Sequence, residues 1–144
     1  MTVGGDIATI ATPALVVDLD RVEHNVRTVL DLAGDPARWR PHLKTTKLPE
    51  VWSLQLDAGI RRFKCATTRE AAVMLELLDE RDIAGGDLLI AYPLLGPARE
   101  RAAALQTAHP RSTLSILVES PDAAANAPSN LGPVSYTHLT LPTT

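Results

Sequence analysis

Short apolar segments alternate with helical segments along most of this chain. Five segments are expected to be strands: Ala14–Asp18, Trp39–Lys44, Arg62–Ala66, Asp87–Tyr92 and Thr113–Val118. The fourth of these is apolar enough to be buried on both of its faces, as strands of parallel sheets are. Strands that alternate with helices are typical of a parallel sheet, because each crossover between parallel strands needs a connecting segment of helix length. The sequence therefore predicts an α/β fold.

Residues that begin and end helices stand at the expected boundaries. A helix is expected over residues 21–33, with Asp20 as its capping residue and Gly34 to end it. Thr67 and Glu70 have the spacing of a capping box at the start of a later helix. Beyond capping, we expect the charge of Glu70 to lie at the surface.

The composition excludes several classes of protein. The net charge is −3, which gives no electrostatic footprint for nucleic acid or for an anionic membrane. No apolar run approaches the roughly 20 residues that are needed to span a bilayer. The lone Cys65 cannot form an internal disulfide, and we interpret it as a small buried strand residue rather than a catalytic thiol. These features suit a cytoplasmic protein without a membrane anchor.

The basic segment around Lys44 is the strongest candidate for chemistry. Side chains alternate along a strand, so Arg40, His42 and Lys44 are expected to share one face, with Lys44 near the carboxyl end. α/β proteins place their active sites at that end of the sheet. A lysine there can attack a carbonyl when desolvation and neighbouring cations lower its pKa, and Arg40 and His42 are expected to supply that positive charge. The alternative is a basic strand end whose ammonium groups are solvated.

The segment from Pro41 to Lys47 reads Pro-His-Leu-Lys-Thr-Thr-Lys. It resembles the Pro-His-x-Lys-Thr-His-Lys motif of the D-threonine aldolase and D-serine dehydratase family of pyridoxal-phosphate enzymes. The resemblance extends over residues 12–20, 54–59, 65–71 and 88–93 in the family's order. These enzymes have the fold of the alanine racemase N-terminal domain.

The resemblance implies that Lys44 is the lysine that binds pyridoxal 5'-phosphate as a Schiff base. Arg40 and His42 are candidate cofactor-binding residues because they share the face of Lys44, and Thr46 is a candidate by its place in the motif. The alternative for His42 is a structural role in filling the barrel. Thr46 stands where the commonest pattern has histidine, which puts the usual environment and reaction in question. Lys47 is expected to be a solvated charge rather than a second catalyst.

The family resemblance implies a partial (β/α)8 barrel, with about half of the barrel present. A complete barrel typically needs roughly 250 residues, and this chain has 144. We expect residues 1–11 to be a leader, residues 12–134 to form the barrel domain, and residues 135–144 to be a non-native tail. The tail lacks a helical pattern and resembles a translated adaptor sequence.

Lyase chemistry on D-β-hydroxy amino acids is the function that the resemblance implies for the full-length parent. The alternatives are an amino-acid racemase and a non-catalytic carrier of pyridoxal phosphate. The parent is expected to bind a small D-amino acid, to form a homodimer and to bind neither nucleic acid nor membrane. A divalent metal is implied for the parent, but its ligands come from later segments, so no metal ligand is assigned in this chain.

Overall fold

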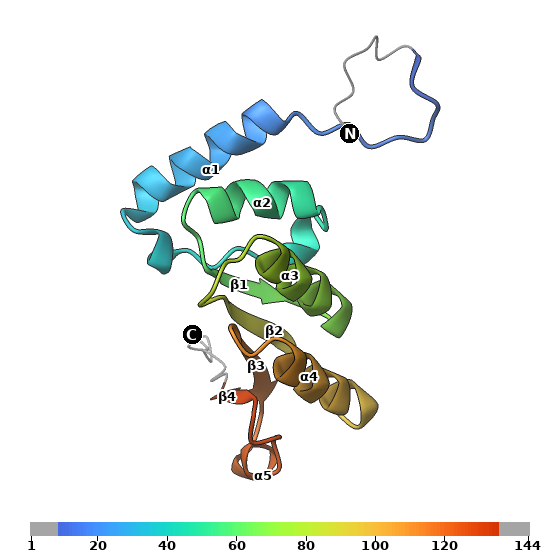
Figure 1. The fold of residues 1–144 in the computed structure, drawn as a ribbon, viewed down its shortest axis with the longest axis vertical. Helices are drawn as coiled ribbons and strands as arrows, with labels where there is room; N and C mark the ends of the chain where they lie inside the picture. Colours follow the sequence, from blue (N-terminus) through green and yellow to red (C-terminus); the bar gives the residue numbers. More distant parts are fainter. Residues whose placement is uncertain (1–8, 136–144) are drawn as a thin grey trace, which may run out of the picture.

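A computed structural model describes residues 9–135 as helices packed on a parallel sheet (Figure 1). The α-helices are α1 (Leu19–Ala33), α2 (Pro49–Asp57), α3 (Thr68–Glu80), α4 (Pro97–Ala108) and α5 (Pro121–Ala125). The short 3₁₀-helices are η2 (Pro36–Arg38) and η3 (Leu43–Thr45). The strands are β1 (Arg62–Cys65), β2 (Asp87–Pro93), β3 (Thr113–Val118) and β4 (Gly132–Ser135).

The sheet order follows the chain order, β1-β2-β3-β4, and each neighbouring pair is parallel. A helix connects each strand to the next, namely α3, α4 and α5 in turn. Because crossovers between parallel strands are right-handed, sequential strands place all these helices on one face of the sheet. In Figure 1, α3 and α4 lie beside each other along one side of the strands. The α/β fold with parallel strands is therefore confirmed.

Burial alternates along the strands, so the sheet has one covered face and one open face. The residues that face the helices are completely buried: Phe63, Cys65, Leu88, Ile90, Leu114 and Ile116. Most residues between them, such as Lys64, Asp87 and Leu89, are only half-buried, although Ser115 of β3 is also buried. Side chains of successive strand residues point to opposite faces, so these half-buried residues lie on the face without helices.

The expected helix boundaries are confirmed at two sites and wrong at one. Gly34 adopts the left-handed conformation with φ of 76° and ends α1. The Thr67 hydroxyl accepts a hydrogen bond from the Glu70 backbone N–H at 3.1 Å and caps α3. The cap of α1 is Asp18 rather than Asp20, because the helix begins at Leu19 and the Asp18 carboxylate accepts from the Arg21 N–H.

The strand expected over residues 14–18 does not form. Leu15 is 79% exposed and Val16 is 55% exposed, and this segment extends away from the sheet (Figure 1). An apolar run predicts a strand only where a neighbouring strand is available to pair with it, and the described residues offer this segment none. Leu15 and Val16 therefore remain in solvent, whereas Val17 is partly buried against the core.

The strand expected over residues 39–44 is reduced to one bridge. His42 pairs in parallel with Lys64 of β1, and the chain then turns into η3. Pro41 has no N–H to donate to a ladder, which limits the pairing on that side. The Pro41 carbonyl still accepts a hydrogen bond from the Lys64 N–H at 2.9 Å. This segment therefore lies beside β1 without becoming a full strand.

The last strand, β4, was not expected from the sequence. Ser135 ends it and pairs with Val118 of β3, so β4 includes the first residue of the expected tail. Residues 1–8, in the expected leader, and residues 136–144 lie outside the described residues.

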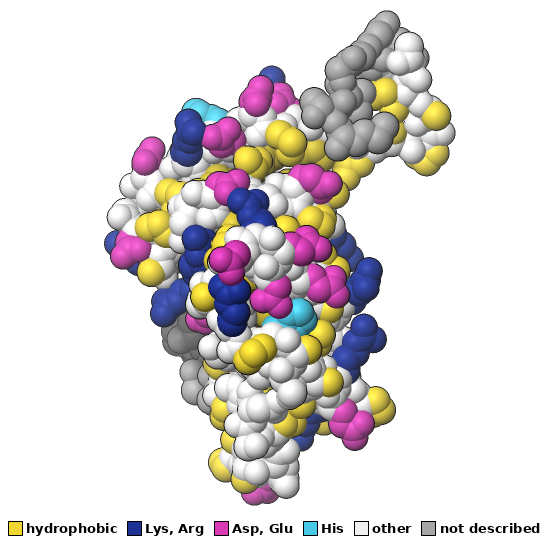
Figure 2. Space-filling model, viewed as in Figure 1, with side chains coloured by type: hydrophobic (Ala, Val, Ile, Leu, Met, Phe, Trp, Pro, Cys, Tyr) yellow, Lys and Arg dark blue, Asp and Glu magenta, His cyan; other side chains and the backbone are white. Residues whose placement is uncertain are grey.

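The surface of the described residues carries charges of both signs. Figure 2, viewed as Figure 1, shows Lys and Arg side chains interspersed with Asp and Glu side chains over the helical side. Within residues 9–135, no helix is long and apolar enough to cross a membrane.

Candidate functional site

Lys44 lies in a turn beside the carboxyl end of the sheet. His42, two residues earlier, pairs with Lys64, and β1 ends one residue later at Cys65. The turn η3, which carries Lys44, contacts β1, and Lys44 itself is exposed to solvent. The position expected for Lys44, at the end of the extended segment, therefore agrees with the structure, although the turn replaces the last residues of the expected strand.

The imidazole of His42 caps the turn that carries Lys44. Its Nδ1 accepts a hydrogen bond from the Lys44 backbone N–H at 3.3 Å. The His42 carbonyl accepts from the Thr45 N–H at 3.2 Å. One residue therefore holds the start of this turn with both its ring and its backbone.

The pKa of His42 is lowered from its ordinary value of 6.5. Partial burial is the main cause, and the positive charges of Lys44 and Lys64 add to it. The carboxylate of Glu70 acts in the opposite direction and raises this pKa, but it does not outweigh the other effects. His42 is therefore neutral at neutral pH, which is the form in which Nδ1 can accept a hydrogen bond.

Glu70 is buried next to this cluster. Only 8% of it is exposed, and its Oε2 accepts a hydrogen bond from the Ala66 N–H at 2.8 Å. The expectation of a surface charge is therefore wrong, because the carboxylate folds back over the end of β1 to satisfy the backbone there. The capping-box spacing of Thr67 and Glu70 was the sequence signal for the contact between the Glu70 carboxylate and the Ala66 N–H. In a capping box, the side chain of the third helical residue bonds to backbone just before the helix.

Cys65 is buried, as expected. No part of it is exposed, and burial together with the charge of Glu70 raises the pKa of its thiol to about 12. A thiol with such a pKa is almost entirely protonated near neutral pH and is a poor nucleophile.

Thr46 bonds to α2 in this structure. Its hydroxyl oxygen accepts a hydrogen bond from Nε1 of Trp52 at 3.2 Å, and Trp52 is almost completely buried. Thr46 therefore ties the turn after Lys44 to the core. The role predicted for Thr46 at a cofactor remains a prediction beside this structural contact.

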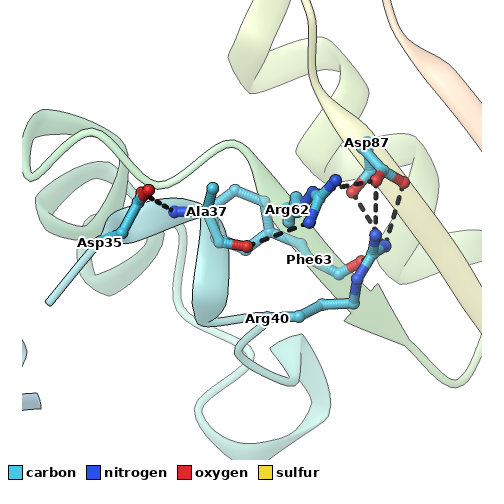
Figure 3. A network of polar contacts seen from close by, with 6 residues as sticks. All are labelled: Asp35, Ala37, Arg40, Arg62, Phe63 and Asp87. Atoms are coloured by element: carbon cyan, nitrogen blue, oxygen red, sulfur yellow. Dashed lines mark hydrogen bonds and ion pairs between the residues drawn. The ribbon is translucent and has the colours of Figure 1, made fainter. Parts of the chain in front are cut away.

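Arg40 lies apart from Lys44, in a polar network at the amino end of β2 (Figure 3). Its Nη1 donates to Asp87 Oδ1 at 3.0 Å and to the Phe63 carbonyl at 3.2 Å, and Nη2 also binds the Asp87 carboxylate. Arg62 adds a second cation, with its Nε 3.6 Å from Asp87 Oδ2. The expectation that Arg40 supplies positive charge beside Lys44 is corrected, because Asp87 holds the guanidinium at the opposite end of the sheet.

The cluster at the carboxyl end therefore consists of His42, Lys44, Lys64 and Glu70. Two of these residues were expected there, and Lys64 and Glu70 were not. Lys64 follows from the alternation of β1, because Phe63 and Cys65 face the helices and Lys64 must face the open side. Lys47 lies beyond the cluster in a left-handed turn, with φ of 55°.

This cluster has the chemistry of a site for an anionic carbonyl compound. Lys44 offers an exposed primary amine that can form a covalent bond with an aldehyde. Lys64 provides a second positive charge on the open face, and neutral His42 offers a ring N–H at Nε2. The aldehyde and the anionic groups of pyridoxal phosphate fit this donor set, with Lys44 as the residue that would hold the cofactor.

Comparison with known proteins finds two lyases to which this chain is similar. It is 32% identical over 121 residues to D-threo-3-hydroxyaspartate dehydratase from Delftia sp. (strain HT23), an alignment that covers 82% of this chain. It is 33% identical over 99 residues to D-threonine aldolase from Arthrobacter sp., which covers 67% of this chain. The chain is a distant homologue of these two lyases. No protein-family model matches it.

A solved structure agrees with this homology. D-threonine aldolase from Filomicrobium marinum superposes with a TM-score of 0.67 and 28% sequence identity over 90% of this chain. The chain spans 29% and 24% of the two curated homologues and 35% of the aldolase structure. The four parallel strands with their helices therefore correspond to about a third of that lyase chain.

Proposed function

We propose that this chain is part of a pyridoxal-phosphate-dependent lyase that acts on D-β-hydroxy amino acids. The observation that carries the proposal is the exposed amine of Lys44, held by His42 at the carboxyl end of a parallel sheet. The distant homology to an aldolase and a dehydratase supports it. In this proposal the four-stranded sheet is about half of an alanine-racemase-type barrel, and a longer parent supplies the rest.

Each residue of the cluster has a defined task in the proposed reaction. Lys44 would hold pyridoxal phosphate covalently, and the cofactor would supply electron withdrawal from the bonds at the substrate's Cα. A Lys44 Nζ that is not bonded to the cofactor would move a proton to or from that carbon. Lys64 balances negative charge on the open face, and His42 keeps the Lys44 turn in place. Glu70 holds the backbone at the end of β1.

A lyase is favoured over the two alternatives because the homologues are an aldolase and a dehydratase. An amino-acid racemase would use the same lysine, and a carrier would bind the cofactor without turnover. The D-amino acid substrate, a homodimeric parent and a divalent metal bound by later segments are proposals for the parent protein.

The cofactor-binding residue can be tested directly on this chain. We expect incubation with pyridoxal phosphate followed by borohydride reduction and peptide mapping to place the label on Lys44. Lys44→Ala is expected to lose this label and the visible absorbance band of the adduct between the lysine and the cofactor. Lys47→Ala is the matched control, because it removes a lysine three residues away and should leave both unchanged. Labelling of Lys47 or Lys64 in preference to Lys44 would refute the assignment.

The reaction itself requires the longer coding sequence. Expressed with pyridoxal phosphate, the parent is expected to release glycine and an aldehyde from D-threonine, or ammonia and a keto acid from D-threo-3-hydroxyaspartate. Interconversion of D- and L-amino acids without either product would favour the racemase. Cofactor binding without any turnover would favour the carrier.

A further inference from the structure

The hydrogen bond between His42 and Lys44 links the charge state of one residue to the position of the other. The Lys44 backbone N–H donates to Nδ1 of His42 at 3.3 Å, which requires a lone pair on that nitrogen. In a neutral ring with this contact, the proton is on Nε2. A protonated ring carries a hydrogen on both nitrogens and cannot accept from Lys44.

Few other contacts hold the beginning of this turn. The Thr45 N–H and the Lys47 N–H bond to the carbonyls of His42 and Leu43, which close the turn from its far side. Leu43 is buried in the core, so its side chain anchors the backbone on one side of Lys44. The ring of His42 is the group that satisfies the Lys44 N–H itself.

We infer that His42 is a positioning residue for Lys44, whose neutral imidazole caps the turn and whose protonation releases it. The inference rests on the proposed function for its importance to the reaction, whereas the cap is a property of the chain itself. A lysine that has to meet a carbonyl depends on the backbone that carries it, since reacting atoms must be aligned within a few tenths of an ångström.

The charges around His42 determine the direction of the pH effect. Lys44 from the turn and Lys64 from β1 oppose protonation of the ring, and Glu70 from α3 favours it. Burial and the two lysines outweigh Glu70, so the pKa of His42 in the folded chain lies below its ordinary value of 6.5. Because this pKa is lowered, the His42 cap is fully present above pH 6.5. It is lost as the pH falls through the lower pKa that His42 has in the folded chain.

Two substitutions separate the cap from the titration. In His42→Asn the amide oxygen lies where Nδ1 was, so it can accept from Lys44, and asparagine is a good capping residue that does not titrate. In His42→Gln the amide lies one bond further out, near the former position of Nε2. Both variants are neutral and polar, so they differ chiefly in whether the acceptor reaches the Lys44 N–H.

The experiment is a pH titration of the ¹⁵N-labelled chain, without cofactor, followed by NMR. The imidazole nitrogens of wild-type His42 are expected to report the Nε2–H form, and the Lys44 amide shift is expected to move with the His42 titration below pH 6.5. His42→Asn should hold the Lys44 amide at its capped shift throughout, and His42→Gln should hold it at the uncapped shift.

The inference would be overturned if the neutral His42 ring carries its proton on Nδ1, or if the Lys44 amide shift does not change as His42 titrates. A His42→Gln spectrum with the wild-type Lys44 shift would do the same. Because no cofactor is present, these results are independent of the borohydride experiment. A cap without Lys44 labelling would reject the proposed function alone, and labelling without a cap would reject this inference alone.

Discussion

At the residue scale, Thr46 provides the most direct test of how the Lys44 turn is anchored. Its hydroxyl accepts from the buried indole N–H of Trp52 at 3.2 Å. Thr46→Val keeps the shape of the side chain but leaves that N–H without its acceptor. We expect the free energy of unfolding to fall by about 1–3 kcal/mol, the cost of a buried unsatisfied donor. Denaturant titration followed by tryptophan fluorescence measures this change.

Thr46→Ser is the matched control, because serine retains the hydroxyl and should keep most of the stability. Equal stability of the valine and wild-type chains would show that solvent satisfies the indole N–H.

In the longer parent that we propose, Thr46→His is expected to shift the pH–rate profile, since histidine titrates near neutral pH and threonine does not. An unchanged profile would leave Thr46 with its structural role alone.

The position of His42 and Lys44 at the end of an extended segment could be predicted from the sequence because it depends on local properties. Alternation along an extended segment and the position of its end are visible in a few consecutive residues. Arg40 was misplaced because its partner, Asp87, lies 47 residues away and exerts its attraction only after folding. Glu70 was assigned to the surface for a related reason, since its burial depends on the path of the chain before α3.

At the element scale, the Arg40–Asp87 ion pair joins the extended segment before η3 to the sheet. Arg40 also donates to the Phe63 carbonyl of β1, so the contact spans two strands (Figure 3). In Asp87→Asn the charge is removed at constant shape. We expect the free energy of unfolding to fall by about 1 kcal/mol or somewhat more, because the pair is only partly exposed.

A local measurement separates this effect from a general loss of stability. The Lys64 N–H donates to the Pro41 carbonyl, so its hydrogen exchange reports whether the extended segment stays on β1. This exchange should accelerate in Asp87→Asn. The control is Asp82→Asn at the exposed pair with Arg111, where we expect a change within about 0.5 kcal/mol and unaltered Lys64 exchange. Equal effects of the two substitutions would refute the special role of Asp87.

Elements with strong local signals were predicted well, and elements that depend on distant partners were not. Gly34 and Thr67 acted as expected because capping involves only nearby backbone groups. β4 was missed because Gly132 and Pro133 are typical of turns, and only pairing with β3 extends them. Gly132 suits this place, since a Cβ there would lie 2.6 Å from the Ser115 hydroxyl. The apolar residues before α1 form no strand because no strand among residues 9–135 pairs with them.

At the scale of the whole molecule, the open face of the sheet sets how the chain behaves in solution. Leu117 of β3 pairs with Val134 of β4 on this face, which no helix within residues 9–135 covers. Within the described residues, β4 also has an unpaired outer edge. Exposed apolar surface beside an open edge promotes association between chains. The open face and this edge therefore predict that the chain associates with itself.

We expect the 144-residue chain to associate as its concentration rises, and to do so through this face and edge. Val134→Lys places a positive charge there, at a side chain that is already 36% exposed, so the fold should tolerate it. Sedimentation velocity over a range of concentrations should then show less association than wild type. Leu32→Lys is the control, because Leu32 is 84% exposed on α1 and distant from the sheet edge. A wild-type chain that stays monomeric and unfolds in one sharp transition would contradict the prediction, and equal effects of the two lysines would place the contact elsewhere.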